Sequence, residues 1–205
     1  SELLFMAPEL VWVHSTGAGV EEFILPHFVD SRIVFTNGRI IQGPEVADHA
    51  LALILALTRN IARMFKGQPH SDMPRAIELR KKTCLIFGLG GIGLLVAERV
   101  KAFGMNVIGI ANDMPPMVSL VDEFYGPERF LEMLPKADVI VCAAPNTERT
   151  RGAIDAAHFA AMKQGCIFIN VSRGAVVDTS ALTDAVRDGK FRGVGLDVTF
   201  PEPLP

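Results

Sequence analysis

From Thr83 onward, short apolar runs alternate with segments of helical periodicity. The apolar runs predict strands at 83–87, 106–110, 121–124, 138–143, 166–171 and 193–198. The segments between them predict helices at 92–103, 127–134, 155–162 and 179–188. Strands that are apolar almost throughout, separated by helices of about ten residues, are typical of a parallel sheet covered on both faces. The sequence therefore predicts an α/β fold, a doubly wound parallel sheet whose ligands bind at the carboxyl ends of the strands.

The chain before Thr83 has a different pattern. Two short strands are predicted at 10–14 and 32–36, the second ended by the turn dipeptide Asn37-Gly38. A helix is predicted over Pro44–Met64, with proline in its first turn. Its middle part, 50–57, is apolar on every side, so it must be covered by a second domain or by a partner subunit. We expect three parts, residues 1–43, 44–66 and 67–205.

Composition narrows the class of protein. The 205 residues are 49% hydrophobic and 21% charged, with a net charge of −3, which excludes a disordered chain. The sequence contains no basic block for nucleic acid, no apolar stretch of membrane-spanning length and no basic leader at its start, so a cytoplasmic protein is expected. Cys84, Cys142 and Cys166 each lie in an apolar run and are expected to be buried free thiols. No close Cys or His spacing indicates a metal site.

A glycine-rich sequence, GLGGIG, follows the predicted strand 83–87 and opens a helix. Gly88 permits a tight turn, Gly90 lets the backbone approach a pyrophosphate, and Gly93 lets the helix pack close to the strand. Gly91 precedes the predicted helix and Ile92 begins it, and the N-terminal N–H groups of this helix attract an anion. In this strand–loop–helix context the motif predicts a Rossmann dinucleotide site, whereas alone it would indicate only a sharp turn.

The residue that selects between the two nicotinamide cofactors is unusual. An acidic side chain that binds the ribose hydroxyls is expected at the end of the second strand, where this chain has Ala111. Asp113 follows two residues later and either reaches the ribose or begins the turn into Pro115-Pro116. No Arg or Lys is present there to bind a 2′-phosphate, so NAD is slightly favoured and NADP is not excluded.

Several segments together resemble the D-isomer-specific 2-hydroxyacid dehydrogenases. They are HSTGAGVEEF, GPEVADHALALILALTRN, LIFGLGGIG, ADVIVCAAPNTERTRGAI, FINVSRGAVVDTSAL and GVGLDVTFPEPLP, in the order of that family and across nearly the whole chain. The resemblance implies a Rossmann cofactor domain together with the remnant of a second, flavodoxin-like substrate domain. It also implies hydride transfer between a nicotinamide and a small 2-hydroxy or 2-oxo acid. The helix 44–64 is similar to the dimer-forming helix of the family, which implies a homodimer; the alternative is a helix of the domain core.

The resemblance also implies roles for particular residues. Arg173 matches the arginine that clamps the substrate carboxylate and polarises the adjacent carbonyl, chemistry that suits a guanidinium fork. Glu202 matches the carboxylate that pairs with a catalytic histidine and raises its pKa. Ala18 and Gly19 match a loop whose N–H groups bind the substrate carboxylate. Without the family, Arg173 would be interpreted as a surface turn residue and Glu202 as an exposed loop charge.

The remaining matches concern the cofactor. Asp197 matches the residue that binds the nicotinamide carboxamide, and Ser172 matches a backbone contact near the nicotinamide. Pro145 and Thr150 match a loop that lines the cofactor. Loop residues of these kinds also serve turn geometry, so the structural interpretation stays open for Pro145, Thr150 and Ser172.

One departure from the family concerns the proton donor. The family carries its catalytic histidine beyond the glutamate, but all five histidines of this sequence precede Glu202: His14, His27, His49, His70 and His158. Each of these is more readily explained as structural. We therefore expect the 205 residues to be the cofactor domain and a substrate-domain remnant of a longer protein.

Two other classes of function remain open. A non-catalytic dinucleotide-binding module, such as a sensor or corepressor, would need neither Arg173 nor Glu202, which favours the enzyme. An unrelated dehydrogenase with the same cofactor fold, such as an alanine dehydrogenase, is disfavoured by the NVSRGAVVD and EPLP segments. The expected partner is a small 2-oxo or 2-hydroxy acid, with no nucleic acid, membrane or metal.

Overall fold

The computed structural model describes residues 7, 9–17, 19–20, 23, 25–38, 41–114 and 118–202. Its chain forms two compact units, residues 1–44 and 45–205. The boundaries expected from the sequence, after residues 43 and 66, remain predictions.

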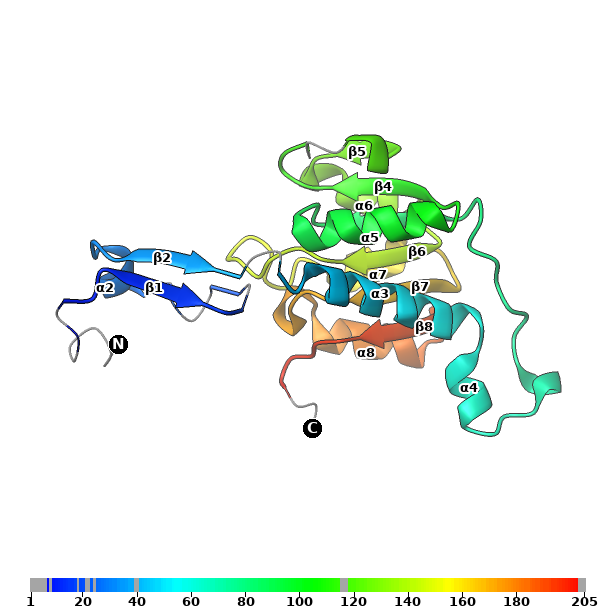
Figure 1. Cartoon of the computed structure of the whole chain (residues 1–205). Helices are drawn as coiled ribbons and strands as arrows, with labels where there is room; N and C mark the ends of the chain where they lie inside the picture. The colour runs from blue at the N-terminus through cyan, green and yellow to red at the C-terminus, as the bar shows by residue number, and fades with distance from the viewer. Residues whose placement is uncertain are drawn as a thin grey trace. The chain divides into compact units, whose positions relative to one another are not determined.

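The larger unit contains a six-stranded parallel sheet (Figure 1). Its strands lie in the order β5-β4-β3-β6-β7-β8, and every neighbouring pair is parallel. Their bounds are β3 Thr83–Phe87, β4 Asn106–Ile110, β5 Glu123–Tyr125, β6 Val139–Cys142, β7 Cys166–Asn170 and β8 Phe191–Leu196. The predicted doubly wound α/β class is confirmed.

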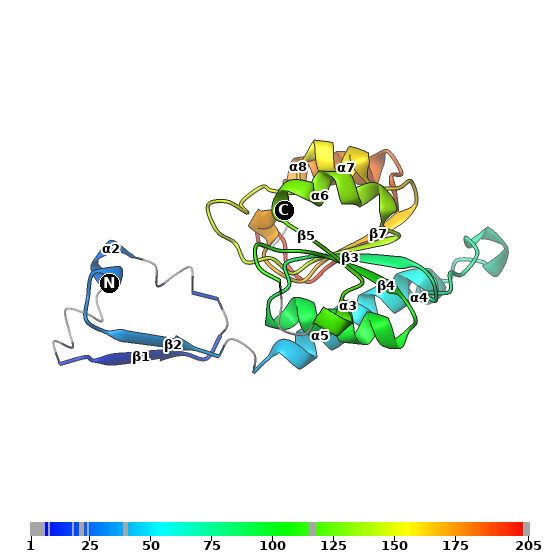
Figure 2. The same cartoon turned by 90° about the horizontal axis from the view of Figure 1, so that it is seen from above.

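Helices cover both faces of this sheet (Figure 2). One face packs against α3 (Gly43–Thr58) and α5 (Gly91–Ala102), and the other against α6 (Phe130–Met133), α7 (Ala156–Ala161) and α8 (Thr179–Arg187). Alternate strand residues serve opposite cores. In β3, Leu85 and Phe87 face the α6–α8 side, and Cys84 and Ile86 face the α3–α5 side. Both faces are apolar for this reason, which explains the continuous hydrophobic runs.

The predicted single helix over 44–64 is wrong: the structure has α3 followed by a separate α4, Ile61–Phe65. Asn60, between them, has a left-handed backbone with φ 61°. Its Nδ2 donates to the Pro74 carbonyl at 2.6 Å, and its Oδ1 accepts from Arg192 at 3.0 Å. The Arg192 guanidinium also lies 3.4 Å from the carbonyl oxygens of Leu57 and Thr58. These contacts satisfy the last carbonyls of α3 and end it there.

The other predicted strands and helices are present with their ends shifted by at most two residues, except the helix predicted over 127–134. The short helix α2 (Pro26–Val29) was not predicted. The segment predicted as a helix over 127–134 is a 3₁₀ turn, the short helix α6 and a second 3₁₀ turn, Leu134–Lys136. Pro127 and Pro135 fall in the two 3₁₀ turns, where a missing N–H is tolerated.

The smaller unit contains a two-stranded parallel sheet. β1 (Trp12–Ser15) pairs with β2 (Val34–Asn37), and α2 (Pro26–Val29) lies between them in sequence. The rings of Phe23, Phe28 and Phe35 contact one another, with Phe23 and Phe35 centroids 4.8 Å apart. All three rings are half-buried.

The three cysteines are free and buried, as expected. Burial raises the pKa of the Cys84 thiol to about 12 and that of Cys142 to about 11. Such thiols stay protonated near neutral pH and behave as small apolar side chains. Among the described residues, no helix combines the length and apolar character needed to cross a membrane.

Candidate active site

The glycine loop lies between β3 and α5, and each of its three motif glycines has a different environment. Gly88 has φ +99°, and a Cβ there would lie 2.5 Å from the Ala144 nitrogen. A Cβ on Gly93 would lie 1.9 Å from the Gly88 carbonyl oxygen. A Cβ on Gly90 would meet nothing within 4 Å, so the space beside this backbone is open. Two of the glycines are therefore required by packing, and the third leaves room for a ligand.

The first turn of α5 follows Gly90 directly, because Gly90 is the N-cap of this helix. Gly91 and Ile92 are its first residues, and the N–H groups of a first helical turn have no partner within the helix. These groups and the positive end of the helix dipole suit a phosphate. The loop and helix therefore fit the pyrophosphate of a dinucleotide.

The strand order reverses beside this loop. β4 lies on one side of β3, and β6, which comes later in the sequence, lies on the other. Gly88 donates through its N–H to the Ile110 carbonyl at 2.8 Å, and Ala143 donates to the Phe87 carbonyl at 2.8 Å. Because ligands of such sheets bind where the order reverses, the loops after β3 and β6 form the expected crevice.

The position expected to bind the adenosine ribose carries no charge. Ala111 is half-buried and donates through its N–H to the Tyr125 carbonyl at 3.2 Å. Asn112 and Asp113 are exposed. The predicted turn into Pro115-Pro116 lies outside the described residues.

The loop after β6 is organised by Thr150. Its hydroxyl donates to the Pro145 carbonyl at 2.5 Å and accepts from the Thr147 N–H at 2.7 Å. This hydroxyl therefore fixes the turn. Whether Pro145 and Thr150 also contact a cofactor stays a prediction.

The predicted substrate arginine lies just after the end of β7. Arg173 follows the last residue of β7 by three positions and is exposed at the carboxyl edge of the sheet. Its Nη1 donates to the carbonyl of Ser172 at 2.8 Å. The Ser172 side chain is buried, and its Oγ lies 3.2 Å from the Cys142 Sγ of the neighbouring strand β6.

The segment that leads to Glu202 packs directly against Gly174, the residue after Arg173. A Cβ on Gly174 would lie 2.1 Å from the carbonyl carbon of Thr199 and 2.5 Å from the Phe200 nitrogen. The Phe200 carbonyl accepts from the Thr179 hydroxyl at 2.6 Å. Glu202 is exposed two residues later. The structure thus brings the segments of the two predicted catalytic residues together.

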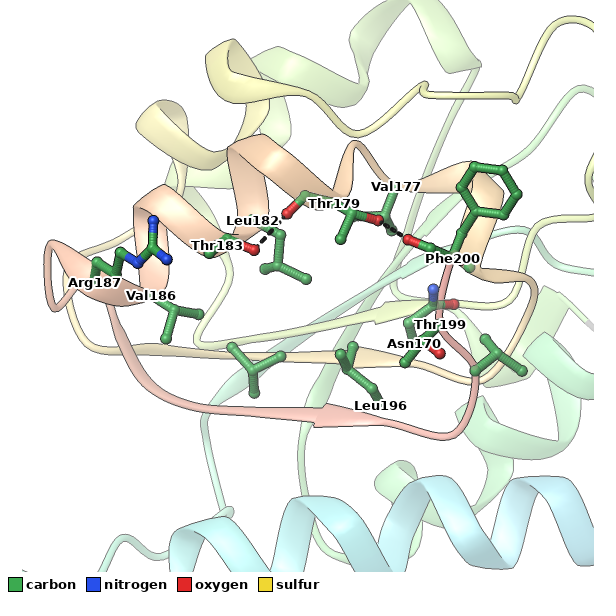
Figure 3. A pocket seen from close by; sticks show the side chains of 13 residues that line it. Asn170, Val177, Thr179, Leu182, Thr183, Val186, Arg187, Leu196, Thr199 and Phe200 are labelled. Carbon is green, nitrogen blue, oxygen red and sulfur yellow. Dashed lines mark hydrogen bonds between the residues drawn. The ribbon is translucent and has the colours of Figure 1, made fainter. Parts of the chain in front are cut away.

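A cavity of about 400 Å³ lies beside this contact, between α8 and β8 (Figure 3). Apolar side chains from both elements line most of it, among them Leu182, Val186 and Leu196. Asn170, at the end of β7, also borders it.

Asp197, the predicted carboxamide residue, follows β8 at the same edge. Its N–H donates to the Asn170 carbonyl at 3.0 Å. His49, which we expected to be structural, points its Nε2 toward the Asp197 Oδ1 at 3.5 Å. The spacing of His49 and Asp197 in the sequence gave no sign of this contact.

The predicted carboxylate-binding loop belongs to the smaller unit. Ala18 lies outside the described residues, and Gly19 is half-buried within that unit. The contribution of both residues to a site stays a prediction.

Asn170 is a polar residue of this edge that the sequence analysis did not single out. It is 1% exposed and makes hydrogen bonds to both Ser172 and Arg173. A local signal for it existed, because Asn at a strand end often bonds the backbone two residues further on.

Comparison with known proteins agrees with this arrangement. Residues 51–205 match the model of the D-isomer specific 2-hydroxyacid dehydrogenase family, NAD binding domain. D-3-phosphoglycerate dehydrogenase of Methanocaldococcus jannaschii is 33% identical over 98% of this chain, which spans 39% of that protein.

Two solved structures are also similar. D-lactate dehydrogenase from Aquifex aeolicus, complexed with NAD and lactic acid, superposes with a TM-score of 0.84 at 33% sequence identity. The matched region is 98% of this chain and 62% of the chain of that enzyme. A family member from Xanthobacter autotrophicus Py2, in complex with NADPH and MES, gives a TM-score of 0.84 at 28% identity, covering 98% of this chain and 64% of its own. The family model, the sheet order and the glycine loop agree, and the chain belongs to the D-isomer specific 2-hydroxyacid dehydrogenase family through its NAD-binding domain.

Proposed function

We propose that the whole protein transfers a hydride between a nicotinamide cofactor and a small 2-hydroxy or 2-oxo acid. The observation that carries this proposal is the close packing of Gly174 on Thr199 and Phe200. It joins the segments of Arg173 and Glu202 at the sheet edge that also carries the glycine loop. A module that only binds a dinucleotide needs neither charged side chain.

The glycine loop and the start of α5 would bind the pyrophosphate, and Asp197 would accept a hydrogen bond from the nicotinamide carboxamide. Bound cofactor supplies or accepts the hydride. We propose NAD(H) as the preferred cofactor, because the residues at 111–113 are Ala, Asn and Asp and provide no cation for a 2′-phosphate.

Arg173 would bind the substrate. Its guanidinium can donate two parallel hydrogen bonds to a carboxylate, and its positive charge stabilises the negative charge that develops on the adjacent carbonyl oxygen. The bond from Nη1 to the Ser172 carbonyl holds one side of the guanidinium near the backbone at the sheet edge. Arg173 therefore orients the 2-oxo acid and polarises it.

Glu202 would orient and charge-stabilise a proton donor. A carboxylate beside an imidazole favours its protonated form and so prepares it to give a proton to the substrate oxygen. We assign no histidine of this sequence to that role, because none follows Glu202 and the His49 contact is with Asp197.

Activity measurements on the whole protein test the proposal. NADH and NADPH oxidation should be followed with glyoxylate, hydroxypyruvate and pyruvate. We expect turnover with at least one acid. Arg173→Ala should lower kcat/KM for it by about 10²–10³-fold while leaving the Kd of NADH within about twofold. Arg80→Ala, which removes an exposed guanidinium paired with Glu78, is the matched control and should change neither value.

Two results would contradict the proposal. Turnover that is equal in the Arg173→Ala variant and the unsubstituted protein would remove the substrate role of Arg173. NADH binding with no turnover of any of the acids would favour the non-catalytic module instead.

We also propose that the protein is a homodimer through α3 and α4. The buried face of α3 (Ala47, Ala50, Ile54) packs on the sheet, which explains part of its apolar character. On α4, Met64 is 52% exposed and Phe65 is 89% exposed, so apolar surface remains for a partner. Light scattering after size exclusion tests this, and a monomer at micromolar concentration would contradict it.

A further inference from the structure

Asn170 closes a small hydrogen-bonded ring at the end of β7. Its Oδ1 accepts from the Ser172 N–H at 3.0 Å and from the Ser172 hydroxyl at 2.9 Å. Its Nδ2 donates to the Arg173 carbonyl at 3.1 Å. One carboxamide thus holds a backbone N–H and a backbone carbonyl of the turn that presents Arg173.

The backbone of Asn170 makes a further connection. Its carbonyl accepts from the Asp197 N–H at 3.0 Å, which extends the pairing of β7 with β8 beyond Leu196. The Ser172 hydroxyl, in turn, lies against Cys142 of β6. Asn170 therefore connects directly to the predicted substrate arginine and to the predicted carboxamide aspartate.

The ring needs a side chain that both donates and accepts, which an amide does at any pH. The side chain must accept on one atom and donate on the other, and at 1% exposure water cannot replace a missing bond. An aspartate has the same shape, but its carboxylate accepts only and would face the Arg173 carbonyl. A carboxyl that is protonated can again donate and accept, so the ring can reform when that proton binds.

We propose that Asn170 is a positioning residue, whose carboxamide sets the backbone of the Arg173 turn and whose carbonyl sets Asp197, so that substrate and nicotinamide groups are held at one spacing. The inference rests on the proposed function of Arg173 and Asp197. It assigns Asn170 no contact with substrate or cofactor. Its effect passes through the guanidinium, so loss of the ring should weaken carboxylate binding more than dinucleotide binding.

Asn170→Asp in the whole protein tests this. Burial raises the pKa of the new carboxyl, whereas the two hydrogen bonds from Ser172 lower it. The variant is therefore compared at about pH 8.5 and about pH 5.5, because any reformation of the ring must occur toward the acid side. At the higher pH we expect KM for the 2-oxo acid, and the Kd of oxamate for the NADH complex, to rise about tenfold to a hundredfold, since small misplacement is costly in such sites. At the lower pH, the KM and the oxamate Kd of the variant, each divided by the value for the unsubstituted protein, should return toward one.

Asn60→Asp is the matched control. Asn60 is also buried, also donates through Nδ2 to a backbone carbonyl and also accepts on Oδ1, but it lies at the end of α3 next to Arg192. Its variant should leave KM and the oxamate Kd unchanged at both pH values. Thermal unfolding without cofactor compares the stability loss of the two variants independently of activity.

Asn170→Ser covers the case in which the aspartate variant does not fold. Serine can accept from the Ser172 N–H but is too short to reach the Arg173 carbonyl, so KM should rise with no recovery at low pH. The inference is overturned if the Asp variant still turns over and binds oxamate with the Kd of the unsubstituted protein. If only the Ser variant folds, the same result in that variant overturns it. Absence of turnover in the unsubstituted protein overturns the proposed function and the inference with it.

Discussion

Gly90 and Gly93 belong to one motif, but the structure predicts opposite results for alanine at the two positions. Gly90 has an extended backbone, φ −75° and ψ −163°, that any residue can adopt, and open space at its Cβ position. Gly93 is in the first turn of α5 with the Gly88 carbonyl 1.9 Å from its Cβ position. Gly90→Ala should therefore spare the fold and damage the ligand site, and Gly93→Ala should damage the fold.

The effect of Gly90→Ala on stability follows from two opposing terms. Alanine has fewer conformations than glycine in the unfolded chain, which stabilises the folded protein by about 0.4–1 kcal/mol where alanine can adopt the native backbone angles. Gly90 is also the N-cap of α5, where alanine is poorer than glycine by about 0.5–1 kcal/mol. The free energy of unfolding should then change by less than about 0.5 kcal/mol. For Gly93→Ala the helix must move away from the loop, and we expect a loss of about 1–3 kcal/mol or more.

Gly90→Ala should weaken cofactor binding although it leaves the stability nearly unchanged. A methyl group on Gly90 would occupy space expected for the pyrophosphate and separate it from the N–H groups of α5. Losing a single charge-assisted hydrogen bond, worth about 1.5–3 kcal/mol, weakens binding about tenfold to a hundredfold.

Urea denaturation without cofactor and NADH fluorescence titration measure the two effects in the whole protein. The expected result for Gly90→Ala is an unchanged urea midpoint with a Kd raised at least about tenfold. NADH binding as tight as in the unsubstituted protein would refute the location of the pyrophosphate at 88–93. A stability loss equal to that of Gly93→Ala would refute the steric argument itself.

Three further predictions concern other residues. Ala111→Asp should raise the Kd of NADPH relative to that of NADH by about tenfold, because a carboxylate binds ribose hydroxyls and repels a 2′-phosphate; equal Kd changes for both cofactors would contradict this. Arg192→Met removes the donors at the end of α3 and should lower the free energy of unfolding in urea by about 1–3 kcal/mol, with Arg80→Ala as the unaffected control. Hydrogen bonds from the His158 side chain and N–H hold the pKa of Asp155 below its ordinary value of 3.8. The ionised Asp155 carboxylate therefore stabilises the folded protein above that pH, and this stabilisation is lost as the pH falls through the lowered pKa. Asp155→Asn should therefore show a shallower loss of stability below about pH 4, and an unchanged acid slope would count against it.

The sheet could be predicted from the sequence because its strands are buried on both faces. That burial makes each strand continuously apolar, and the glycine motif marks β3 as the strand before the phosphate loop. β5 gave a weak signal because it is a three-residue strand at the edge of the sheet, with an exposed Glu123.

The end of α3 could not be predicted in the same way. The residues 50–57 continue the apolar pattern, and Asn60 is a weaker local stop signal than the glycine that more often ends a helix. The cap comes from Arg192, which is 132 residues away from Asn60 in the sequence. Tertiary contacts of this kind override local pattern, so a reading of neighbouring residues joins α3 and α4 into one helix.

The placement of His49 shows how a packing pattern can determine part of a site. A Cβ on Gly193 would lie 2.6 Å from Leu57, and one on Gly195 would lie 3.1 Å from the Cβ of Leu53. Four residues of a helix rise about 6 Å, and two residues of a strand span about 6.6 Å. Every four residues of α3 therefore lie beside two residues of β8.

Extending that register by one step from the Leu53–Gly195 contact pairs position 49 with position 197. The 3.5 Å contact between His49 and Asp197 is the result. The two glycines allow α3 to lie close to β8, and this close packing brings the N-terminal half of the helix to the carboxyl edge of the sheet. An apolar helix that the sequence presents as core or interface therefore also carries an ionisable side chain to the predicted nicotinamide aspartate.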